Sequence, residues 1–203
     1  MEETRNVIQQ NFHNLLTKLM KSLGTVYPES TELLGACIFL GGLTDEDEKA
    51  NIMRQYYEAV KPHMDELHDR DVEVLRTVVA STPILNKLGL VEIVNNPEFE
   101  QSHEVFFKYL DNLTSMCRMQ FEVSARMMQA IESVGKDVAQ KMKSGYTPSS
   151  AADVEGLGKA VVDKLGESGD SKFVMEETNK LLDILTSNHE FEDLIMKHVQ
   201  AAQ

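Results

Sequence analysis

The chain contains no proline between Pro97 and Pro148, and apolar residues recur every three or four positions along much of that stretch. This spacing is typical of an amphipathic helix, because it places the apolar side chains on one stripe. The stripe consists of Phe106, Leu110, Leu113 and Cys117 and continues, after a one-residue shift, with Phe121, Ala125, Met128 and Ile131. Asn96 ahead of Pro97 is a favourable helix start, since asparagine accepts free N–H groups and proline lacks one. The sequence therefore predicts one long helix from Pro97 to about Lys141.

A second apolar face lies on the same predicted helix between residues 116 and 134. A helix that is apolar on two sides is either buried in the centre of a bundle or part of a contact surface. The pattern leaves both alternatives open. Methionine is common at adaptable binding surfaces because its side chain is flexible and polarizable. The residues predicted to contact a partner protein or a second copy are Met116, Met119, Val123, Met127 and Met128.

The rest of the chain also has helical spacing, interrupted by glycine and proline. The further long helices are predicted over residues 4–23, 32–40, 44–61, 71–79, 150–165, 171–185 and 189–200. The segment LLGACIFLGG is apolar all round, so the second of these helices is expected to lie in the core with no exposed side. Thr44, with Asp47 three residues later, predicts the start of the helix over residues 44–61.

The best linker candidate is residues 141–149, KMKSGYTPS, in which Gly145 and Pro148 interrupt any helical period. We therefore expect an all-α fold in two parts. Residues 1–143 would form the main domain, a multi-helix bundle around one long central helix. Residues 144–203 would form a smaller C-terminal helical segment.

The charge balance restricts the partners, because 33 acidic residues against 20 basic ones give a net charge of -13. Direct binding to nucleic acid is not expected, since it requires clustered lysine and arginine. A basic partner would be attracted instead. The one lysine group, Lys136, Lys141 and Lys143, falls in the last turns of a predicted helix, where cations complement the helix dipole.

Neither a membrane span nor an export signal is expected, because no apolar run approaches about 18 residues and the N-terminus begins with an acidic pair. Cys37 and Cys117 are the two cysteines, and both lie in apolar contexts typical of reduced, buried thiols. The sequence therefore predicts an intracellular protein.

The hexapeptide HMDELH places His63 and His68 five residues apart. Zinc hydrolases use a spacing of four, which leaves the two rings about 40° apart around a helix, whereas a spacing of five separates them by about 140°. A metal-dependent enzyme would need a histidine of this pair, or His103, to converge with Glu100 or Glu104. That is the alternative to a non-enzymatic role; the sequence predicts no catalytic residue, no cofactor and no metal ligand.

Residues 5–117 carry a pattern that resembles a known group of proteins. The pattern comprises F-x-x-L-L-x-x-L from Phe12 to Leu19, the Tyr27-Pro28-Glu29 sequence, PILNKLGLVEIV and VFFKYL. It resembles uncharacterised helical proteins of large DNA viruses that infect algae and other protists. The resemblance implies a viral structural or accessory protein in the host cytoplasm or the virion, without an assigned activity. The expected role is protein interaction or assembly, with a protein partner or as a homo-oligomer.

Overall fold

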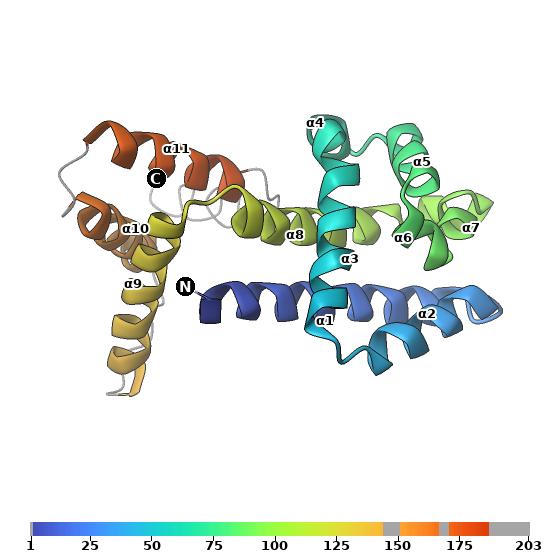
Figure 1. Cartoon of the computed structure of the whole chain (residues 1–203). Coiled ribbons are helices and arrows are strands. Elements are labelled where there is room, and N and C mark those ends of the chain that lie inside the picture. Colours follow the sequence, from blue (N-terminus) through green and yellow to red (C-terminus); the bar gives the residue numbers. More distant parts are fainter. Residues whose placement is uncertain (1, 144–150, 167–170, 187–203) are drawn as a thin grey trace. The chain divides into compact units, whose positions relative to one another are not determined.

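The computed structural model describes residues 2–143, 151–166 and 171–186, which are helical apart from short connections (Figure 1). Over these three ranges the chain contains no β-strand, which confirms the predicted all-α class. Two compact units are present. One is Val7–Arg118, the 7–118 unit, and the other combines Met1–Asn6 with Met119–Gln203, the 119–203 unit. The sequence pattern instead predicts a domain boundary at residues 143–144.

The 7–118 unit contains most of the helices. In chain order its elements are α1 (Glu2–Val26), α2 (Thr31–Gly42), α3 (Glu46–Val60), η1 (Lys61–His63), α4 (Met64–His68), α5 (Val72–Ser81), α6 (Pro83–Lys87), α7 (Leu90–Val94), η2 (Pro97–Gln101) and α8 (His103–Phe121). The first residues of α1 and the last of α8 belong to the 119–203 unit.

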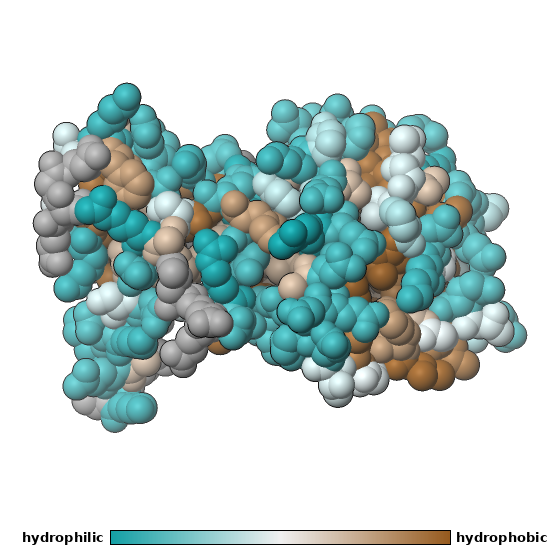
Figure 2. All heavy atoms as spheres, in the orientation of Figure 1, coloured by the Kyte–Doolittle hydropathy of each residue, from teal (hydrophilic) through white to brown (hydrophobic). Residues whose placement is uncertain are grey.

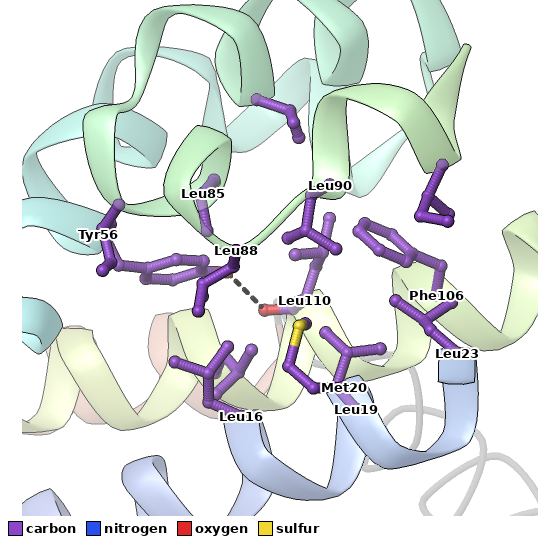
Figure 3. Packing of buried hydrophobic residues seen from close by; sticks show 14 of the residues in the cluster. Leu16, Leu19, Met20, Leu23, Tyr56, Leu85, Leu88, Leu90, Phe106 and Leu110 are labelled. Atoms are coloured by element: carbon purple, nitrogen blue, oxygen red, sulfur yellow. Dashed lines mark hydrogen bonds between the residues drawn. The ribbon is translucent and has the colours of Figure 1, made fainter. Parts of the chain in front are cut away.

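The core of the 7–118 unit forms around Tyr56 of α3, which is 1% exposed. Its ring meets Phe12 of α1 edge to face, with 5.4 Å between the ring centroids. Its hydroxyl donates to the carbonyl oxygen of Leu110 in α8 at 3.2 Å (Figure 3). Burial raises the pKa of the Tyr56 hydroxyl, so it remains a protonated donor. Helix α3 is thereby tied to both α1 and α8.

Side chains cap several helix starts. Asn96 accepts from the backbone N–H of residue 98, as predicted, and Asp71, the first residue of the predicted helix over 71–79, accepts from the N–H groups of residues 73 and 74. The start of α3 differs from the prediction. Its cap is Asp45, whose carboxylate accepts from the Glu48 N–H at 3.0 Å, and not Thr44. A carboxylate also complements the positive end of the helix dipole, which a hydroxyl does less well.

The predicted single helix from Pro97 to Lys141 is replaced by η2, α8 and α9 (Ala125–Lys143). The helical period stops at residues 122–124. Arg5 compensates for this interruption, because its guanidinium donates to the carbonyl oxygens of Gln120, in the last turn of α8, and of Val123, within the break. These carbonyls lose their helical partners at the break, and a cation there also complements the dipole.

The start of α9 is stabilised from the other side of the break. The hydroxyl oxygen of Ser124 accepts from the Met127 N–H at 3.1 Å, and Glu177 accepts from the Ser124 N–H at 3.1 Å. Glu177 is only 4% exposed. Burial alone would raise the pKa of Glu177, but hydrogen bonds from Lys180 and Ser124 outweigh it and lower the pKa. The break is therefore a capped helix boundary.

The remaining described helices of the 119–203 unit are α10 (Ala151–Gly166) and α11 (Ser171–Thr186), which agree with the two predicted ranges within a few residues. Helix α10 packs against both α9 and α11. Residues 144–149 of the predicted linker and the predicted helix over 189–200 lie outside the described residues.

Candidate protein-interaction surface

Helix α2 exposes one apolar side, whereas the sequence predicts a helix buried all round. Leu34 and Ile38 are 63% and 68% exposed, the two highest values among the large hydrophobic side chains of the described residues. They are four residues apart and therefore adjacent on one side of the helix. The opposite side of α2 faces the core with Leu33, Ala36 and Leu40. The prediction was wrong because a uniformly apolar helix gives no periodicity from which to tell its inner and outer sides.

The exposed residues of this helix side define the α2 outer face. They are Thr31, Leu34, Gly35, Ile38, Gly41 and Gly42. Figure 2 shows hydrophobic residues at the molecular surface over α2. None of the six carries a charge, so the face offers apolar contact along the helix.

Glycines make this face flat. A Cβ atom added to Gly35, Gly41 or Gly42 would meet no atom of the described residues within 4 Å, so none of these neighbours requires glycine there. Glycine inside a helix costs about 0.5–1 kcal/mol relative to alanine. Gly35 therefore lowers the stability of α2 without improving the packing of the chain itself. It does allow another backbone to come close to the helix.

Exposed carboxylates lie near both ends of α2. They are Glu29 and Glu32 on the N-terminal side and Asp45, Glu46, Asp47 and Glu48 on the C-terminal side. A hydrogen bond from its own backbone N–H, together with the Thr31 hydroxyl, lowers the pKa of Glu32, so this side chain stays ionised. An apolar strip with carboxylates at both ends suits a partner that carries apolar and basic side chains.

The residues predicted from the methionine pattern lie elsewhere and are mostly covered. Val123, Met127 and Met128 are at most 3% exposed, while Met116 and Met119 are half-buried. They fall on both sides of the break between α8 and α9, so they do not share one continuous helix face. The burial favours the interior alternative, and partner binding by these five residues stays a prediction.

The histidines considered as metal ligands have other partners or positions. His103 hydrogen-bonds through Nδ1 to the backbone oxygen of Glu100 at 2.7 Å, and its Nε2 lies 3.7 Å from Glu104. His63 ends η1 and His68 ends α4. Within the described ranges, no three His, Cys, Asp or Glu side chains are grouped so that they could hold a metal ion. The metal-enzyme alternative gains no support from this part of the chain.

None of the helices in the described part of the chain is both long enough and apolar enough to cross a membrane. Comparison with known protein families, with curated proteins and with solved structures gives no match for this chain.

Proposed function

We propose that this chain is a non-enzymatic protein-interaction component and that the α2 outer face is its contact surface. The observation that carries the proposal is the exposure of Leu34 and Ile38 one helical turn apart. Water contact with two large aliphatic side chains is unfavourable, and covering them is worth about 1.5–3 kcal/mol for each one that becomes fully buried. Clustered apolar exposure of this kind marks interaction sites.

The partner that suits this face is an amphipathic helix with basic residues beside its apolar side. Helices recognise one another through apolar residues at positions three and four apart, which is the spacing of Leu34 and Ile38. The glycines of the α2 outer face allow close approach of the two helix backbones. A basic helix is attracted to a chain of net charge -13, whereas a second copy with the same charge is repelled at long range.

Titration with a synthetic amphipathic helix of leucine and lysine, followed by calorimetry, tests this proposal. We expect saturable binding, and we expect the double variant Leu34→Ser/Ile38→Ser to weaken it at least tenfold. This variant keeps the net charge, so purely electrostatic attraction would remain unchanged. Val105→Ser is the matched control because Val105 is an exposed aliphatic residue, 55% exposed, on α8.

Two results would contradict the proposal. The first is equal affinity of the double variant and the unmodified chain for the leucine-lysine peptide. The second is a dimer of the unmodified chain, seen by light scattering, that the same double variant converts to a monomer. That second result would assign the α2 outer face to self-association.

A further inference from the structure

The break between α8 and α9 contains no helix-breaking residue. Sharp interruptions of a helix occur mainly at proline, at glycine–serine pairs, or where a side chain or a water molecule inserts into the backbone hydrogen bonds. Neither proline nor glycine occurs between Pro97 and Gly135. The residues of the break, Glu122, Val123 and Ser124, are all tolerated inside helices. The interruption (Figure 1) therefore depends on side chains from other parts of the chain.

Two distant side chains separate one hydrogen-bonding pair of the helix backbone. In an uninterrupted helix, the N–H of Ser124 would donate to the carbonyl oxygen of Gln120, four positions earlier. Instead, Arg5 donates to the Gln120 oxygen, and Glu177 accepts from the Ser124 N–H at 3.1 Å. Arg5 also donates to the carbonyl oxygen of Val123. All five residues belong to the 119–203 unit, so the arrangement is internal to that unit.

Without these two side chains, the Gln120 oxygen and the Ser124 N–H would have each other as partners. Both of the present hydrogen bonds lie in partly buried surroundings, where an unpaired backbone group is unfavourable. The costly step in helix formation is the first turn, and each later residue adds one hydrogen bond. Because α8 and α9 already supply formed turns on both sides, pairing across the break needs no new first turn.

We propose that the break is a conformational switch that can close, so that α8 and α9 become one continuous helix. Arg5 and Glu177 hold the interrupted form, which is the form in the structure. A partner that engages either side chain would shift the chain toward the continuous form. The continuous form would align four residues of the predicted methionine surface on one stripe: Met116, Met119, Val123 and Met127. This inference does not depend on the α2 outer face.

Amide hydrogen exchange of the full chain, followed by NMR, tests the proposal. Ala125 and Arg126 open α9, so their N–H groups have no helical acceptor in the interrupted form. In the continuous form these groups donate to the carbonyl oxygens four positions earlier. The variant Arg5→Met/Glu177→Leu removes both side-chain partners and should slow the exchange of these two amides at least tenfold. The matched control, Arg54→Met/Glu176→Leu, makes the same substitutions at exposed positions and should leave their exchange unchanged.

A second variant avoids any change to the buried Glu177. Ser124→Ala removes the hydroxyl oxygen that accepts from the Met127 N–H, and alanine has the higher helix propensity. It should slow the exchange of the Ala125 and Arg126 amides at least twofold. If the double variant unfolds, with fast exchange throughout α9, Ser124→Ala alone decides the question. Unchanged or faster exchange of the two amides in the folded variants would overturn the proposal, and so would equal slowing in the matched control.

Discussion

The guanidinium of Arg70 lies 2.9 Å from the carboxylate of Asp111 inside the 7–118 unit, with the two side chains 19% and 8% exposed. Arg70 follows α4 and has a left-handed backbone, with φ of 64°. Its guanidinium also stacks 5.3 Å from the centroid of the Phe107 ring. Left-handed geometry normally favours glycine. The ion pair and the stacking explain why arginine occupies this position, since they join the end of α4 to α8.

Asp111→Asn should lower the free energy of unfolding by roughly 3–5 kcal/mol, because it leaves the Arg70 charge buried without its counter-ion. Urea denaturation measures the change. The double variant Arg70→Gly/Asp111→Asn removes the stranded charge and relieves the left-handed backbone, so its loss should be smaller than the sum of the two single losses. Additive losses would show that the pair is not energetically coupled.

Gly89→Ala should destabilise the chain by about 2–4 kcal/mol, from backbone strain together with overpacking. Gly89 has φ of +75°, and an added Cβ would lie 2.5 Å from the Cβ of Glu32 in α2. Thermal unfolding followed by circular dichroism measures the effect. Gly24→Ala is the matched control, since its Cβ would meet nothing within 4 Å. An unchanged melting temperature for Gly89→Ala would contradict the close approach of this turn to α2.

Gly35→Ala should change stability and binding in opposite directions. The added methyl group meets no neighbour, so the variant should gain about 0.5–1 kcal/mol of stability from improved helix propensity. The same methyl group would stand on the α2 outer face and should weaken binding of the leucine-lysine helix. Chemical denaturation and calorimetry on the same sample provide both values. Stronger or unchanged peptide binding would remove Gly35 from the contact surface.

The sequence predicts where the helices begin and end better than it predicts which distant residues contact them. Asp71 and Asn96 could be identified as caps because capping is a local interaction of a side chain with nearby N–H groups. The break between α8 and α9 could not be predicted in this way, because it is stabilised by Arg5 and Glu177, which are distant in sequence. Apolar periodicity continues across the break after a one-residue shift, and that shift was the only local signal.

The candidate surface was missed for a related reason. Composition identifies α2 as apolar, but which side is covered depends on helices that pack against it from elsewhere in the chain. The glycine at position 35 was an available signal, since glycine inside a helix lacks a local explanation. The hydrogen bond between His13 of α1 and the carbonyl oxygen of Leu40 in α2 likewise could not be predicted, because sequence spacing does not place these residues side by side.

The two cysteines should differ sharply in their reaction with a thiol reagent. Cys117 is 0% exposed, and burial raises the pKa of its thiol well above the ordinary value, so little reactive thiolate forms. Cys37 is half-buried in α2, and both cysteines are free thiols. Absorbance with a disulfide reagent should show one thiol reacting in the native chain and two in urea. Cys37→Ser should abolish the native reaction; rapid labelling that persists in this variant would show that Cys117 is accessible.

Stability should fall as the pH decreases from about 7 toward 5, in part because of His13. Burial, with a smaller contribution from the Lys49 charge, lowers the pKa of His13 below its ordinary value of 6.5, while Leu40 and Glu46 act in the opposite direction. The unfolded chain therefore binds this proton at a higher pH than the folded chain. The stabilising contribution is complete above pH 6.5 and is lost as the pH falls through the folded pKa. Urea unfolding at several pH values gives the free energy of unfolding as a function of pH. This free energy should fall less between pH 7 and pH 5 for His13→Gln than for the control His103→Gln. Equal pH dependence in the two variants would contradict a buried neutral ring.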